Sequence, residues 1–143
     1  MVSFLGYNLV VVPFGLVLNA YVSRYDPNLV REAIVVTGIV TIVMTALGTA
    51  FPRFFRRIGL PLLVALVSIF LIEAFQIFIV GGDPAWIDWV VALIFCGYIG
   101  YDWGRANSIP KTVDNAVDAA AAIYMDIVNL FVRLLSRLDS DED

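Results

Sequence analysis

Four long apolar stretches alternate with short polar segments along the chain. They occupy residues 2–22, 33–50, 60–80 and 87–103. A helix rises about 1.5 Å per residue, so such stretches have roughly the length needed to cross about 30 Å of hydrocarbon. The first stretch has no basic segment before it and no small-residue cleavage pattern after it, so we expect a retained helix and not a signal peptide. The pattern predicts an all-α integral membrane protein in which residues 1–105 form a bundle of four transmembrane helices.

The segment after the fourth span predicts one further helix, over residues 106–138. Its apolar side chains recur at alternating steps of four and three, which places them on one face. These positions are Val113, Val117, Ala120, Tyr124, Ile127, Phe131, Leu134 and Leu138. The pattern is that of an amphipathic helix on the cytoplasmic side, and three arrangements fit it: a helix on the leaflet surface, a coiled coil with a partner helix or a second copy, and a helix packed on the protein's own loops. Residues 139–143 form an acidic tail.

The basic residues between the spans predict an orientation. Five of them lie between the second and third spans or after the fourth, at Arg53, Arg56, Arg57, Arg105 and Lys111. The first connection holds only Arg24 and Arg31. Because cytoplasmic loops carry the excess of Lys and Arg, we expect both termini on the cytoplasmic side of a cell membrane, or on the inner side of a virion membrane.

The overall composition limits the chemistry. Hydrophobic residues make up 61% of the 143 residues and charged residues only 15%, with 13 acidic against 9 basic side chains and no histidine. Without histidine, a Ser-His-Asp triad or an HExxH metal site cannot form, and the single Cys96 cannot build a thiolate metal cage. We therefore expect no metal and no cofactor, and no nucleic-acid partner because a basic stripe is missing. The missing nucleophile-base and metal sets disfavour an enzyme but leave that question open. The acidic excess is typical of halophilic proteins and suggests a haloarchaeon or its virus as the source.

Four polar residues stand out because hydrocarbon should exclude them. Glu73 lies well inside the third span, where a carboxylate costs about 3 kcal/mol. Gln76 follows one turn later, while Asn19 and Asp88 lie towards the same outer side. These side chains either form a ligand-binding pocket open to the outer leaflet or hydrogen-bond one another to fix helix packing. Since Glu73 is the one charge deep in a predicted span, a channel or ion carrier is disfavoured.

Two short motifs accompany these residues. Residues 12–19 read Val-Pro-Phe-Gly-Leu-Val-Leu-Asn after Asn8, and residues 72–76 read Ile-Glu-Ala-Phe-Gln ahead of Asp88. Together they resemble the Pro-Phe-Gly helix and the Glu-x-x-Gln and Asp pattern of VanZ-like membrane proteins, and Gly97 and Gly100 are similar to the glycines of that family's last helix. The resemblance covers residues 8–20 and 60–103. It implies glycopeptide resistance or, for a haloarchaeal source, a lipid or cell-envelope role.

The sequence thus favours a VanZ-like protein that binds a lipid or envelope-derived head group through Glu73, Gln76, Asp88 and Asn19. The alternative is a structural or assembly protein of a cell or viral membrane, whose C-terminal helix recruits partners. A third hypothesis, an intramembrane enzyme with Glu73 and Asp88 as acid and base, lacks a visible nucleophile. The expected partners are membrane lipid and, through the C-terminal helix, a second copy or a partner helix.

Overall fold

The protein is a bundle of long helices. The computed structural model describes residues 2–82 and 84–142, and every regular element in these ranges is helical. The elements are α1 (Val2–Val22), α2 (Pro27–Ala50), α3 (Pro52–Arg57), α4 (Gly59–Phe75), the π-helix η1 (Gln76–Val80), α5 (Ala85–Ser108) and α6 (Val113–Glu142). Of the predicted acidic tail, Asp143 lies outside the described residues.

Local sequence signals set several helix boundaries. Asp26 precedes Pro27, and its carboxylate accepts a hydrogen bond of 2.9 Å from the backbone N–H of Asn28, which caps the start of α2. Gly81 directly follows η1 and adopts a left-handed conformation with φ of 82°. Its N–H donates to the carbonyl of Gln76 at 2.7 Å and closes the π-helix. Glycine permits this reversal because it has no Cβ.

Five helices of the described chain are long and apolar enough to cross a membrane. They are Phe4–Val22, Pro27–Ala50, Gly59–Val80, Ala85–Ser108 and Val113–Asp139. The all-helical membrane architecture is confirmed, but the prediction of four spans is wrong. The fifth is the segment that the heptad pattern indicated as a cytoplasmic amphipathic helix. The prediction for this segment failed because its polar side chains, such as that of Asp126, are buried against other helices. They therefore do not mark a water-facing side of the helix.

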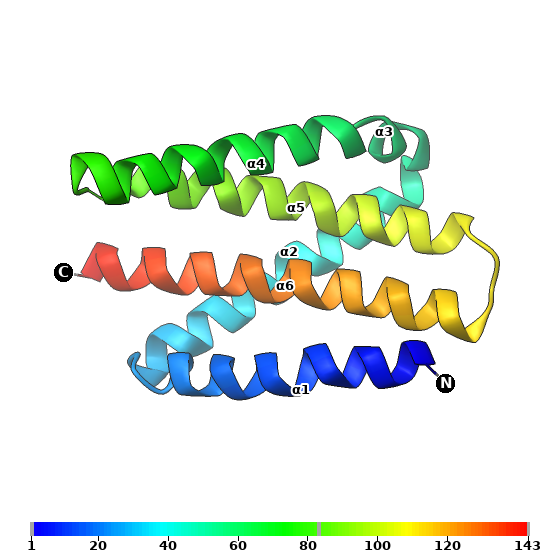
Figure 1. Cartoon of the computed structure of the whole chain (residues 1–143), viewed down its shortest axis with the longest axis horizontal. Coiled ribbons are helices and arrows are strands. Elements are labelled where there is room, and N and C mark those ends of the chain that lie inside the picture. Colours follow the sequence, from blue (N-terminus) through cyan, green and yellow to red (C-terminus); the bar gives the residue numbers. More distant parts are fainter. Residues whose placement is uncertain (1, 83, 143) are drawn as a thin grey trace.

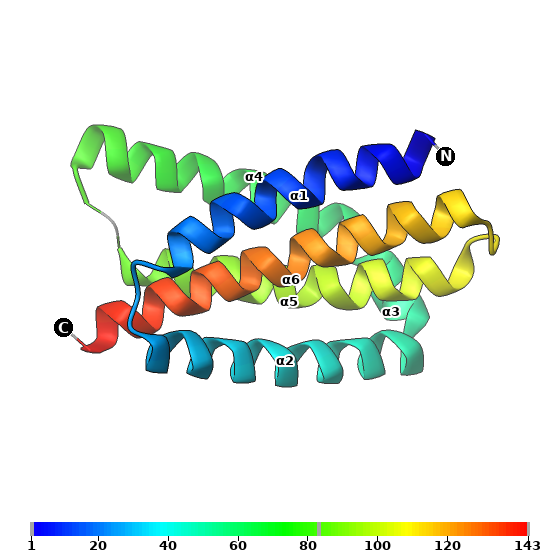
Figure 2. The same cartoon turned by 90° about the horizontal axis from the view of Figure 1, so that it is seen from below.

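The helix α6 lies in the middle of the bundle. It packs along α5, its main neighbour, and also contacts α2 and α1. Figures 1 and 2 show α5 and α6 side by side, and Figure 2 shows α2 on one side of the pair and α1 and α4 on the other. Buried Ile87, Val91, Phe95 and Ile99 from α5 join Leu130 of α6 in the main apolar core. The assembly alternative needs a free C-terminal helix, and α6 instead contributes to this core.

The two ends of the chain lie at opposite ends of the bundle (Figure 1). Five candidate spans match this arrangement, because each crossing would move the chain to the other side of the membrane. The prediction that both termini are cytoplasmic therefore does not fit this bundle. Figure 1 also shows α3 and the connection between α5 and α6 at the same end as the N-terminus.

Two glycines allow α2, α3 and α5 to approach closely. A Cβ added to Gly48 on α2 would lie 2.6 Å from the carbonyl oxygen of Gly100 on α5, and a Cβ on Gly100 would collide with the ring of Phe55. Nearby, the indole N–H of Trp103 donates to the hydroxyl of Thr49 at 2.8 Å. Small residues commonly permit such contacts between membrane helices. Gly100 is therefore explained by helix packing.

Candidate functional site

One ion-paired cluster joins three helices near one end of the bundle. The Nη1 of Arg133 on α6 donates to Oε1 of Glu73 at 2.6 Å and to Oδ1 of Asp88 at 2.9 Å. Its Nη2 donates to Oε2 of Glu73 at 2.9 Å, so the guanidinium and this carboxylate form a two-point pair. The side chains of Arg133, Glu73 and Asp88 are 21%, 17% and 11% exposed. The three residues are thus largely withdrawn from the surface.

Chain geometry explains how the two acids meet. Glu73 lies in the last turn of α4, and Asp88 lies in the first turn of α5, where the helix dipole favours a negative charge. The helices α4 and α5 pack against each other and run in opposite directions, so that the end of α4 and the start of α5 lie at the same end of the bundle (Figure 1). A carboxylate in hydrocarbon is costly unless it is paired. Arg133 provides the pairing for both acids.

A second pair of acids lies elsewhere between the same helices. Asp126 of α6 is only 7% exposed, and its carboxyl lies within interaction range of the carboxyl of Asp102 on α5. One oxygen of Asp126, Oδ2, is buried and has no hydrogen-bond partner among the residues that the structure describes. Buried polar atoms are nearly always satisfied, so this oxygen calls for a proton, a water molecule or a cation.

The two clusters lie along one seam between α5 and α6. On α5, the steps from Asp88 through Ala92, Phe95 and Ile99 to Asp102 alternate between four and three residues. On α6, Leu130 lies between Asp126 and Arg133 with the same steps. Such spacing keeps residues on one helix face. Phe95, Ile99 and Leu130 are buried, so an apolar layer separates the two clusters.

The structure brings together two of the four predicted site residues, Glu73 and Asp88. Gln76 starts η1, and its backbone carbonyl accepts hydrogen bonds from the N–H groups of Gly81 and Gly82. Asn19 is exposed on α1 and lines an apolar groove between α1, α2 and α6. Among the described residues, neither of these two side chains forms a hydrogen bond with Glu73.

Sequence reasoning missed Arg133, Asp102 and Asp126. The missing signal was the need of Glu73 for a cation, because Arg133 lies well inside residues 113–139 and could meet that need once this segment is counted as a span. With that segment counted as a span, Asp126 becomes a second deep carboxylate. The argument that Glu73 is the one deep charge is therefore wrong.

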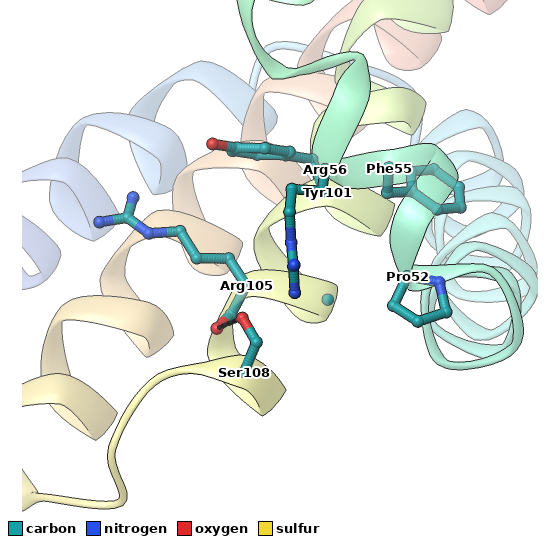
Figure 3. Close-up of a pocket in the computed structure, with 7 residues that line it drawn as sticks. Pro52, Phe55, Arg56, Tyr101, Arg105 and Ser108 are labelled. Atoms are coloured by element: carbon teal, nitrogen blue, oxygen red, sulfur yellow. Dashed lines mark hydrogen bonds between the residues drawn. The ribbon is translucent and has the colours of Figure 1, made fainter.

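A small hollow of about 60 Å³ lies at the basic end, between α3 and α5 (Figure 3). Its lining includes Arg56 of α3 and Arg105 and Ser108 of α5. Figure 3 shows the side chains of Arg56 and Arg105 pointing in different directions. The two guanidinium groups do not converge on one ligand, so the carboxyl clusters are the stronger candidate site.

The described residues contain no group of three or more His, Cys, Asp or Glu side chains that could hold a metal ion. Each cluster offers two carboxyl groups. Carboxyl oxygens suit protons and hard cations such as Ca²⁺ or Mn²⁺, whose remaining ligands are often water. The arrangement therefore fits transient contact with a cation better than a permanent metal centre.

Comparison with known families matches residues 1–143 to the family described as "Inhibitor of apoptosis-promoting Bax1". The chain belongs to this family. The VanZ-like resemblance is wrong, because it rested on short motifs of residues that are common in membrane helices, whereas the family match covers the whole chain. The predicted function of binding a lipid head group was implied by that resemblance and is therefore also wrong.

Relatives of this Bax-inhibitor family chain include named eukaryotic and viral proteins. It is 32% identical over 129 residues to mouse protein lifeguard 4, covering 88% of this chain and 53% of the relative. It is 31% identical over 127 residues to the Golgi anti-apoptotic protein of vaccinia virus (strain Lister), covering 87% and 53%. It is 30% identical over 129 residues to Bax inhibitor 1 of Schizosaccharomyces pombe, covering 87% and 47%.

The chain spans about half the length of these curated relatives. No solved structure matches it. Nothing in these relatives supports a halophilic source or a cell-envelope role. They support a multi-pass membrane protein of the Bax-inhibitor type, in agreement with the apolar helices.

Proposed function

We propose that this chain is a cation-handling membrane unit that contributes to suppressing cell death. The second part of the proposal comes from the names of the relatives, which include an anti-apoptotic protein and a Bax inhibitor. The first part comes from the bundle itself. Proteins that keep ionisable groups inside a membrane generally use them for ion or proton movement.

The single observation that carries the proposal is the meeting of Asp102 and Asp126. Two carboxylates that face each other away from water repel, and a shared proton or a bound cation relieves the repulsion. The buried Oδ2 of Asp126 receives no N–H or hydroxyl donor from the described residues, so it is free to share a proton with the carboxyl of Asp102 or to contact such a cation.

The distribution of charge supports an orientation for this unit. The N-terminus, α3 and the connection between α5 and α6 share one end of the bundle (Figure 1). That end carries Arg53, Arg56, Arg57, Arg105 and Lys111. The positive-inside rule assigns it to the cytoplasm, which places the C-terminus and the Glu73 cluster towards the opposite side.

Lipid is the partner that the outer faces favour. Large apolar side chains such as Leu9, Leu16, Ile42, Leu63 and Phe78 are exposed on α1, α2, α4 and η1. An apolar surface of this extent is covered by hydrocarbon or by other membrane helices. These exposed faces surround the α5 and α6 seam and keep it inside the membrane.

Cation flux tests the proposal. The full chain is reconstituted in liposomes that contain fluorescent reporters, and the entry of Ca²⁺, K⁺ and protons is measured between about pH 6 and pH 8, around the range in which biological proton switches operate. We expect flux above that of protein-free liposomes, with a pH dependence that Asp126→Asn removes. The matched control is Asp114→Asn, an exposed acid on the same helix. Flux equal to that of empty liposomes under all conditions contradicts the proposal.

A further inference from the structure

A nitrogen of Arg133 lies where a bound cation would lie between two carboxylates. Nη1 is 2.6 Å from an oxygen of Glu73 and 2.9 Å from an oxygen of Asp88. The two acids come from different helices, α4 and α5, and the guanidinium reaches them from α6. Each acid therefore directs an oxygen at a single positively charged point.

We infer that Glu73 and Asp88 form a second cation site, which Arg133 fills as a tethered competitor. The site would take a small inorganic cation that prefers oxygen ligands, and a divalent ion matches its two carboxylates best. This inference rests on the proposed function and deepens it, since it adds a second cation-binding position to the seam between α5 and α6. We call the Asp102 and Asp126 pair the inner station and the Glu73 and Asp88 pair the outer station. The inference also gives Arg133 a role besides holding helices together.

The charge balance of the cluster supports this assignment. One guanidinium faces two carboxylates, so the cluster retains one net negative charge while Arg133 is in place. Glu73 takes both terminal nitrogens, whereas Asp88 receives a hydrogen bond from Nη1 alone. A divalent cation in place of the guanidinium would neutralise both acids.

The position of the cluster gives a cation access to it. Asp88 lies in the first turn of α5, close to the end of the bundle, and the three side chains keep between 11% and 21% of their surface exposed. Arg133 carries a long side chain with several rotatable bonds, so its head can leave the acids while α6 stays packed. The apolar layer of Phe95, Ile99 and Leu130 then separates this station from Asp126.

Asp126 and Arg133 are seven positions apart, which is two turns or about 10 Å along α6. The two stations thus lie at different depths on one face of the helix. Release of Arg133 would create a cation site at one depth, while the carboxyl pair provides another. In this geometry the guanidinium of Arg133 occupies the position that a cation would take at the outer end of the seam.

Direct binding of Mn²⁺ tests the inference independently of flux. The purified full chain in detergent is titrated with Mn²⁺, and bound ion is followed by electron paramagnetic resonance. We expect Arg133→Gln to bind Mn²⁺ at least roughly tenfold more tightly than the unmodified chain, and Arg133→Gln with Glu73→Gln to lose this gain. Arg31→Gln, which removes an exposed arginine from α2, is the matched control and should leave binding unchanged.

Arg133→Lys keeps the charge but cannot reach both acids in the same two-point manner, so we expect a gain in binding of a few fold. If Arg133→Gln unfolds without a cation, Mn²⁺ should restore its folding, because an ion that binds the folded state stabilises it. Equal Mn²⁺ affinity in the unmodified chain, Arg133→Gln and Arg133→Lys overturns the inference. An Arg133→Gln chain that is unfolded without a cation and that Mn²⁺ does not refold also overturns the inference.

The failure of this inference differs from the failure of the proposed function. Asp126→Asn in the Arg133→Gln chain should keep the gained Mn²⁺ binding, because Asp126 does not belong to the outer station. Mn²⁺ binding without any cation flux would contradict the proposed function alone. Flux through the carboxyl pair without a gain of binding in the Arg133 variants would contradict the second site alone.

Discussion

Arg133 and Glu73 are sixty positions apart in the chain, yet their side chains meet through two hydrogen bonds of 2.6 and 2.9 Å. This contact ties α6 to the end of α4, and the bond from Arg133 to Asp88 extends the link to α5. The guanidinium of Arg133 on the fifth helix can remain in hydrocarbon because it is paired with these two carboxylates.

Glu73→Gln should lower the stability of the bundle. The change leaves Arg133 largely withdrawn from water with Asp88 as its remaining acidic partner, and loss of one member of a buried ion pair costs about 3–5 kcal/mol. Since these side chains keep some exposure, we expect about 2 kcal/mol, measured as thermal or denaturant unfolding in detergent. Glu32→Gln, an exposed acid on α2, is the control. Equal unfolding of both variants would show that the pair adds no stability.

Gly100→Ala should also destabilise the protein, by about 1–3 kcal/mol, because overpacking forces neighbours to shift. The added methyl group would collide with the ring of Phe55. Gly6→Ala is a matched control, since a Cβ at Gly6 meets nothing within 4 Å. Unfolding midpoints that are the same for the two variants would contradict the close approach of α3 and α5.

The five-span arrangement predicts which residues share a side of the membrane. In a Cys96→Ser background, single cysteines at Arg24, Lys111 and Asp139 are labelled with a membrane-impermeant thiol reagent in oriented vesicles. Five spans place the positions of Arg24 and Asp139 on one side and that of Lys111 on the other. If the cysteines at Lys111 and Asp139 react from the same side, α6 does not cross the membrane.

Leu130→Asn should increase cation flux in liposomes. The side chain of Leu130 is 1% exposed and lies between the two carboxyl clusters on α6. An amide at this position would allow water into an apolar layer that otherwise excludes ions. Leu93→Asn, at an exposed position on α5, controls for the introduction of a polar residue. Equal flux from Leu130→Asn and the unmodified chain would show that this layer is no barrier.

The helical membrane character follows from sequence because hydrocarbon forces each span to satisfy its own backbone hydrogen bonds. Sequence also shows that Glu73 needs a partner, since an isolated carboxylate is costly at that depth. The identity of the partner does not follow, because Arg133 reaches Glu73 only through the tertiary packing of α4, α5 and α6. The heptad pattern around Asp126 similarly describes one apolar seam, but it does not distinguish a helix at the membrane surface from one packed inside a bundle.

The most direct test of the carboxyl pair is a double-mutant cycle on Asp102 and Asp126, read as Ca²⁺ flux in liposomes across a range of pH. Residues that act as one unit are non-additive, so we expect Asp102→Asn, Asp126→Asn and the double variant to lose flux and pH dependence to the same extent. Independent, additive losses from the two substitutions, or flux that neither substitution changes, would contradict a shared cation site between α5 and α6.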